Sequence, residues 1–220
     1  MKLSRLTSPT VPGGATLVVP LGSTEQHGPH LPLGTDTAVA VAVCDRLAAR
    51  RADVVVAPAL PYGSSGEHAG FAGTLSIGQE ALERVVVELV RSADAFAAVV
   101  LVSGHGGNAE PLARAVAVLR SEGRRVEAWS PRIAGGDAHA GRTETSLLLA
   151  LDPAAVWLDR AEAGATAPLS ELMPALRDGG VRAVSANGVL GDPTGASAAE
   201  GEQILDALVA DLERSLSVGP

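Results

Sequence analysis

Apolar segments without polar alternation constrain the fold of this chain more than any other feature of its sequence. Residues 15–21, 53–57 and 97–102 are short apolar runs that predict buried strands, and residues 125–129 are expected to form a fourth. Strands that are apolar on both faces are typical of a mostly parallel sheet covered by helices on both sides.

Helical patterns separate these strands. Helices are expected over residues 37–50, 79–93, 110–122, 144–151 and 198–216. Thr143 is the expected N-cap of the fourth helix. In the second helix, the spacing predicts one apolar face made of Leu82, Val85, Val86 and Leu89. The alternation predicts the α/β class, with one domain over residues 1–220 built as a three-layer α/β/α sandwich.

Composition narrows the class further. The chain has 220 residues, 46% of them hydrophobic and 19% charged, which excludes a disordered protein. The formal net charge of −8 argues against a nucleic-acid partner. The longest apolar run, residues 95–102, is too short to span a membrane. Cys44 is the only cysteine, so no internal disulfide forms and a cytoplasmic location is expected.

The histidines are the main indication of function. All five lie outside the expected helices and strands, in turns that follow the four strands; they are His27, His30, His68, His105 and His139. Glycine is frequent in these turns. Because the carboxyl ends of parallel strands meet at one edge of a sheet, we expect these side chains to gather there.

Carboxylates near these histidines complete a set of metal ligands. Imidazole and carboxylate together are typical ligands of catalytic transition metals. Glu25 and His27 are two residues apart, so an extended backbone directs both to the same side. Asp36 has a short carboxylate suited to bridge two ions about 3.5–4 Å apart. His105 and Glu144 would complete the site.

Other roles remain open for several of these residues. Asp36 has the position of a helix cap, and Glu144 suits the dipole of a helix start. For His30 we expect support of a ligand through a hydrogen bond rather than direct metal binding. Arg142 is also compatible with an ordinary surface position. A phosphate-binding role for residues 104–107 is disfavoured, because their spacing matches no nucleotide-binding motif.

Four stretches carry a resemblance to a known family. They are GSTEQHGPHLPLGTD at residues 22–36, GEHAGFAGTLSI at 66–77, SGHGGN at 103–108 and DAHAGRTETSLL at 137–148. In this order they resemble the creatininase family of metal-dependent amidohydrolases. The resemblance implies a creatininase-like fold, hydrolysis of amide C–N bonds and a homo-oligomer.

The resemblance also implies two divalent ions per chain, with Zn, Fe(II) or Mn as candidates. Glu25 and His105 match ligands of one ion, and His27 matches a ligand of the other. Asp36 matches the bridging carboxylate. Glu144 takes the place of a ligand found in related amidohydrolases.

Further roles follow from the same motifs, with some departures. His139 matches the catalytic histidine of the family, and we expect His68 to orient the substrate or to hydrogen-bond the tetrahedral intermediate. Gly107 stands where creatininase itself has a glutamate ligand, and Arg142 stands where many members have glutamate. The tryptophans that enclose creatinine have no counterpart near His139, so creatinine is not the expected substrate.

The short chain and the stretch GDAHAGRTETS most resemble family members that remove a C-terminal Val-Tyr dipeptide from a modified ribosomal peptide in redox-cofactor biosynthesis. Arg142 is then the candidate to bind the substrate's terminal carboxylate, because guanidinium pairs with carboxylate through two hydrogen bonds. One alternative is hydrolysis of a small cyclic amide or a formamide at the same metal site. Another is a metal-binding protein without turnover.

Overall fold

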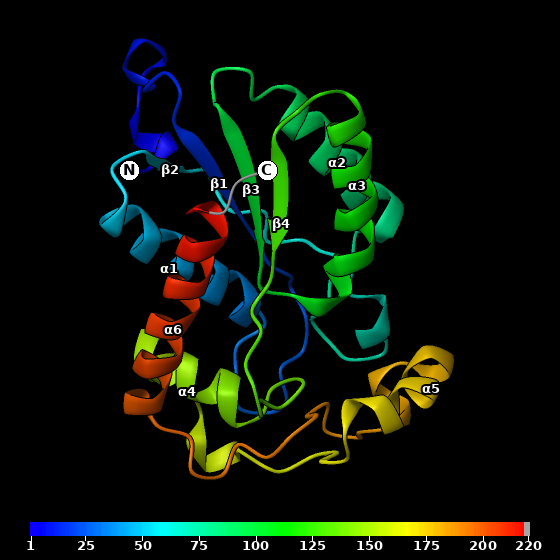
Figure 1. Ribbon diagram of the computed structural model, residues 1–220. Coiled ribbons are helices and arrows are strands. Elements are labelled where there is room, and N and C mark those ends of the chain that lie inside the picture. Colours follow the sequence, from blue (N-terminus) through cyan, green and yellow to red (C-terminus); the bar gives the residue numbers. More distant parts are fainter. Residues whose placement is uncertain (218–220) are drawn as a thin grey trace.

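A four-stranded parallel sheet lies at the centre of the computed structural model, which describes residues 1–217 (Figure 1). Its strands are β1 (Thr16–Leu21), β2 (Val54–Val56), β3 (Ala98–Ser103) and β4 (Val126–Trp129). The order is β2-β1-β3-β4, and every neighbouring pair is parallel. The expected strands and the parallel sheet are confirmed. Because β1 lies between β2 and β3, the connections diverge between β1 and β3, which is where open α/β sheets bind ligands.

Three helices cover one face of the sheet. They pack against every second side chain of the strands. Val18 and Val100 point to this face and pack in one core cluster with three helices. These helices are α1 (Thr35–Arg50), α4 (Arg142–Leu151) and α6 (Ala198–Ser217). Cys44 is fully buried in the same cluster, and removal of the thiol from water raises its pKa.

The opposite face has its own core. Leu17, Val19 and Leu101 alternate with the residues of the first face and pack against α2 (Gln79–Arg91) and α3 (Ala109–Ser121). Figure 1 shows α2 and α3 on one side of the sheet and α1, α4 and α6 on the other. The three-layer α/β/α architecture predicted from the sequence is therefore confirmed.

Two helices start two residues earlier than predicted. Helix α1 begins at Thr35, so Asp36 lies in its first turn, and its N-cap is Gly34. Helix α4 begins at Arg142 with Gly141 as N-cap, so the prediction of Thr143 as N-cap was wrong. The reason is a distant cap: the carboxylate of Asp137 accepts the backbone N–H groups of Arg142 and Thr143.

The buried face of α2 also differs from the prediction. Its buried side chains are Leu82, Val86, Val87 and Val90. Val85 and Leu89 were expected on this face but are 40% and 39% exposed. The spacing places the four predicted residues on one apolar side, and packing against α3 turns the helix so that half of them face outward.

Helix α5 (Leu169–Gly179) was not predicted, because Pro174 lies inside it and interrupts a helical pattern. None of its residues is buried, and it lies apart from the sheet (Figure 1). Short 3-10 turns connect the larger elements: Leu3–Arg5, Ser8–Thr10, Gly66–His68, Gly106–Asn108, Pro153–Ala155, Leu158–Arg160 and Val181–Ala183. Within residues 1–217, no helix has the length and apolar content that a membrane crossing requires.

Candidate active site

The loops that follow β1 and β3 bring the expected metal ligands together at the carboxyl end of the sheet. Glu25 and His27 come from the first loop, and His105 comes from the second. Asp36, in the first turn of α1, lies against the second loop. Gly104 permits this contact, because a Cβ atom there would lie 2.4 Å from the backbone oxygen of Asp36. These four ligand candidates are at most 5% exposed.

A first group of ligand atoms consists of Oε1 of Glu25, Oδ2 of Asp36 and Nδ1 of His105. Nδ1 of His105 lies 3.1 Å from the glutamate oxygen and 3.3 Å from the aspartate oxygen. The three residues offer atoms that all lie within 4.8 Å of one another. Both oxygens are buried without a hydrogen-bond partner among the described residues. Buried carboxylate oxygens without a donor are costly unless a cation neutralises them.

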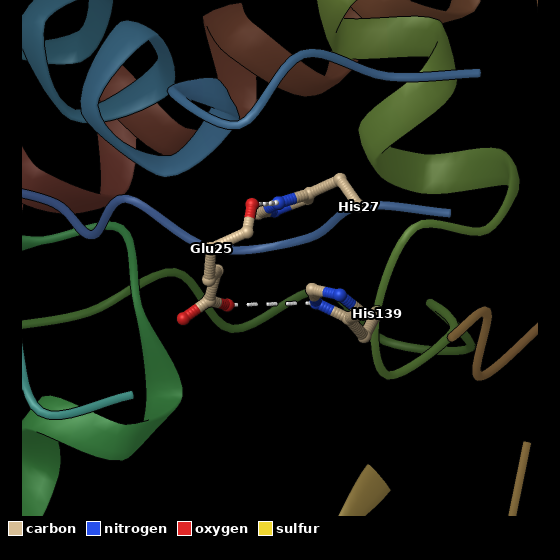
Figure 2. A group of neighbouring side chains, drawn as sticks. All are labelled: Glu25, His27 and His139. Atoms are coloured by element: carbon tan, nitrogen blue, oxygen red, sulfur yellow. Dashed lines mark hydrogen bonds and ion pairs between the residues drawn. The ribbon is translucent and has the colours of Figure 1, made fainter. Parts of the chain in front are cut away.

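A second group consists of His27, Asp36 and Glu144, which also offer atoms within 4.8 Å of one another. Nε2 of His27 lies 3.0 Å from Oδ1 of Asp36 and 3.8 Å from Oε2 of Glu144. Nδ1 of His27 lies 3.1 Å from the backbone oxygen of Glu25, which fixes the ring (Figure 2). Nε2 therefore faces the carboxylates.

The two groups share Asp36, whose oxygens face different histidines. Oδ2 lies beside His105 and Oδ1 beside His27. A carboxylate with this orientation is what a bridge between two cations requires. The donors are imidazole nitrogens and carboxylate oxygens, a set that suits divalent transition metals. The residues present thus fit the expected pair of ions.

The pKa values of these groups reflect close charges in a buried space. Burial alone would lower the pKa of His27, but Asp36, Glu144 and Glu25 outweigh it and raise the pKa to about 10. His27 and His105 hold the pKa of Asp36 well below its usual range, despite its burial. Desolvation, helped by Asp36 and opposed by His27, raises the pKa of Glu144 to about 7.

His139 lies beside both groups, on a turn with unusual backbone geometry. Its ring centroid is 4.4 Å from that of His27, and Figure 2 shows Nδ1 directed toward Glu25. Nδ1 lies 3.8 Å from Oε1 of Glu25 and 4.0 Å from Oε2 of Glu144. Ala140 follows with φ of 52° and donates its N–H to Glu144. This strained turn sets the direction of both His139 and Glu144.

Burial lowers the pKa of His139 well below its ordinary value, and His27 and His68 act in the same direction. The ring is therefore neutral at physiological pH. Glu25, His27 and His139 also form a third group with ligand atoms within 4.8 Å of one another. Metal binding by His139 is thus a geometric alternative to a role in proton transfer.

The remaining two histidines lie in different surroundings. Nε2 of His68 is 3.3 Å from Oε1 of Glu25, so His68 borders the first ligand group. Burial lowers its pKa. His30 is buried beneath the site. The hydroxyl of Thr145 donates to the backbone oxygen of Gly141, so Nε2 of His30 donates to Thr145 at 2.9 Å. His30 thereby contacts the first turn of α4, which also carries Glu144.

A cavity of about 980 Å³ opens beside the ligand groups. Its polar lining includes Glu25, Asp36, His105, His139 and Glu144. Apolar side chains line much of the rest, among them Ile133, Leu147, Leu169, Leu190 and Ile204. The volume is in the range of small-molecule sites.

Arg142 lies at the edge of this cavity and is paired with an acid. Its Nε lies 2.8 Å and 3.0 Å from the two carboxylate oxygens of Glu200. The side chain of Arg142 is 52% exposed. This ion pair uses Nε and neither of the two terminal nitrogens.

Two further residues of the site were missed from the sequence. The carboxylate of Glu67 lies 3.3 Å from Nε2 of His105 and fills the space above Gly107, where a Cβ atom would lie 2.4 Å from Oε1 of Glu67. Gln26 contacts His68 and His139. Both residues lie next to predicted site histidines, and that adjacency was the available signal.

Comparison with known proteins identifies the class of enzyme that this fold and site define. The family model "Creatininase: Creatinine amidohydrolase" matches residues 4–216, so the chain belongs to the creatininase family. The resemblance stated from the motifs is confirmed.

Curated relatives narrow the comparison. The chain is 52% identical to the mycofactocin precursor peptide peptidase of Mycobacterium tuberculosis (strain H37Rv), over 98% of this chain and 90% of the relative. It is 56% identical to the protein of the same name from Mycolicibacterium smegmatis, over 88% and 81%. A solved structure named "Creatininase Mn" superimposes with a TM-score of 0.80 at 29% identity, covering 98% of this chain and 96% of that one. Its family and its sequence relatives therefore identify the chain as an amide-bond hydrolase.

Proposed function

We propose that this protein is a dinuclear metal-dependent peptidase that hydrolyses a C-terminal amide bond of the mycofactocin precursor peptide and releases a Val-Tyr dipeptide. The observation that carries the proposal is the pair of ligand groups joined by Asp36. Identity above 50% to relatives named for this activity supports the choice of substrate.

Two divalent ions held by Glu25, His27, Asp36, His105 and Glu144 would polarise the substrate carbonyl and lower the pKa of an attacking water molecule. The donor set is compatible with Zn, Fe(II) or Mn. Manganese appears in the name of a structural relative at 29% identity. Measurement of bound metal in purified protein decides between these ions.

His139 is the proposed proton carrier of the reaction. It is buried and neutral, and its Nδ1 faces Glu25 and Glu144. A neutral imidazole in this position accepts a proton from the attacking water and returns it to the leaving amine. His68, whose Nε2 lies 3.3 Å from Oε1 of Glu25, is proposed to orient the substrate amide. His30 supports the start of α4 through Thr145.

Arg142 is proposed to bind the terminal carboxylate of the peptide. It lines the cavity, and Glu200 holds it through Nε, so its terminal nitrogens remain for a second carboxylate. The apolar residues of the cavity would accommodate valine and tyrosine side chains.

The substrate is tested with synthetic peptides on metal-loaded protein. A peptide that ends in Val-Tyr with a free carboxylate is expected to be cleaved to the dipeptide, as detected by mass spectrometry. The same peptide with a C-terminal amide is expected to be cleaved with a higher KM. Arg142→Ala is expected to raise KM for the free-acid peptide and to leave that of the amidated peptide nearly unchanged. Equal effects on both peptides would reject carboxylate binding by Arg142.

A second candidate is hydrolysis of a small cyclic amide or a formamide at the same metal site. Creatinine itself is disfavoured, because neither Trp129 nor Trp157 is among the residues that line the cavity. Adding cyclic amides and formamides to the same assay separates the two candidates. A protein that binds metal but cleaves none of them would be a metal-binding protein without turnover.

The proposed setting is a cytoplasmic homo-oligomer. The single buried cysteine is compatible with a reducing compartment, and the family resemblance favours assembly. Fractionation of cells and light scattering of the purified protein test these two points.

A further inference from the structure

The side-chain amide of Gln26 is buried among groups from four separate parts of the chain. Oε1 accepts the backbone N–H of Gly28 at 2.9 Å. Nε2 lies 3.0 Å from the backbone oxygen of Gly188 and 2.9 Å from Nδ1 of His68. Nε2 of His139 is also close, at 3.1 Å. Gln26 is 5% exposed, so its amide is almost fully removed from solvent.

The orientation of this amide follows from its two backbone partners. The N–H of Gly28 can only donate, so the atom that faces it must be the amide oxygen. The carbonyl of Gly188 can only accept, so the atom that faces it must be the amide nitrogen. A flipped amide would oppose two donors at one end and two acceptors at the other.

The number of hydrogens on the Gln26 amide then determines the tautomer of His68. The amide nitrogen of Gln26 carries two hydrogens, and one is donated to Gly188. The other is donated to Nδ1 of His68, which must therefore present a lone pair. A neutral His68 thus carries its proton on Nε2, the nitrogen that lies 3.3 Å from Oε1 of Glu25.

The same number of amide hydrogens determines the tautomer of His139. Gln26 has no third amide hydrogen for Nε2 of His139. That nitrogen lies 2.8 Å from the backbone oxygen of Gln26, which accepts only. Nε2 of His139 therefore carries the proton and donates it to this oxygen. Nδ1 of His139 is left with a free lone pair on the side of Glu25 and Glu144.

We propose that Gln26 is a positioning residue that holds both His68 and His139 as Nε2–H tautomers, so that His139 acts through Nδ1. Gly188 is shaped for this contact: its φ is +84°, and a Cβ atom there would lie 1.9 Å from Oε1 of Gln26. The link to turnover rests on the proposed function, whereas the tautomers themselves do not.

Long-range ¹H–¹⁵N NMR of zinc-loaded protein with ¹⁵N-labelled histidine tests the tautomers directly. In the unsubstituted protein, we expect both rings to show a protonated Nε2 and an unprotonated Nδ1. A protonated Nδ1 on either ring would overturn the proposal, and this result needs no variant.

Gln26→Glu tests whether Gln26 sets the tautomer of His68. The glutamate keeps the size of the side chain and an acceptor for Gly28, but its second oxygen has no hydrogen to donate to His68. We expect His68 to move its proton to Nδ1. The matched control is Gln79→Glu, at an exposed position of α2 beside Arg114, which adds the same charge and is expected to change neither ring. Unchanged tautomers in Gln26→Glu would overturn the role of Gln26.

Gln26→Met removes the amide without adding charge and is the second variant, in case the carboxylate prevents folding. A mixture of both His68 tautomers is expected.

With zinc content measured in parallel, we expect kcat on the Val-Tyr peptide to fall about 10- to 100-fold per bound ion in Gln26→Glu, with little change in KM. A tautomer switch with unchanged kcat would overturn the link to turnover. Failure of the unsubstituted protein to cleave any peptide would reject the proposed function and leave the tautomer result intact.

Discussion

Nε2 of His27 lies 3.0 Å from Oδ1 of Asp36, although His27 follows strand β1 and Asp36 lies in the first turn of α1. The other oxygen of Asp36 faces His105. We expect Asp36→Asn to reduce bound metal from about two ions per chain to less than about one, because a neutral amide bridges two cations poorly. Metal analysis after dialysis is the measurement.

Asp45 provides the control for this substitution. It lies on the same helix, but its carboxylate pairs with Lys2 and is 38% exposed. Asp45→Asn is expected to leave the metal content unchanged. Retention of two ions in Asp36→Asn would contradict the bridging role.

Substitution of His139 distinguishes a role in metal binding from a role in proton transfer. We expect His139→Ala to keep both ions and to lose about 100- to 10,000-fold in kcat, the range of general acid–base catalysis. Metal content and turnover are measured on the same sample. Loss of metal in this variant would instead make His139 a ligand, as its group with Glu25 and His27 allows geometrically.

Metal affinity is expected to rise with pH. Without metal, the raised pKa of His27, about 10, keeps a proton on this ring at pH 7, and Glu144, with a pKa of about 7, is partly protonated. A metal ion must displace these protons, so fewer protons compete as pH increases. Zinc titrations by calorimetry from pH 6 to pH 9, in buffers of different ionisation enthalpy, measure both affinity and proton release. Affinity that is constant over this range would contradict the prediction.

Gly104 binds no metal itself, but its close contact with the backbone of Asp36 predicts an effect of substitution on metal affinity. A methyl group at this position would meet the backbone of Asp36, so Gly104→Ala is expected to push the His105 loop away from α1. We expect metal affinity to weaken about 10- to 100-fold, as for other losses of support around a metal site. A competitive chelator assay is the measurement.

Gly66→Ala is the matched control for Gly104→Ala. A Cβ atom at Gly66 meets no atom within 4 Å, although this residue begins the 3-10 turn that carries His68. Its metal affinity is expected to equal that of the unsubstituted protein. Equal affinities for both variants would show that the contact between Gly104 and Asp36 is dispensable.

Local patterns were sufficient for the sheet and for much of the set of candidate ligands. Strands such as β3 are apolar on both faces because helices cover both, and this composition is visible in the sequence. The rule that parallel strands share one carboxyl edge then brought the loops of His27, His68, His105 and His139 together. These side chains do lie at one edge, within the site described above.

Tertiary packing decided what local patterns do not contain. The apolar residues of α2 mark one broad side, but contact with α3 selected Val87 and Val90 over Val85 and Leu89. Likewise, the side chain and the backbone oxygen of Gln26 form hydrogen bonds with His68, His139 and Gly188, which are 42, 113 and 162 residues away in the chain. Hydrophobic period and turn composition report only on neighbours along the chain. The sequence by itself therefore determined which chemical groups reach the site, and the folded structure determined which atom of each group faces which.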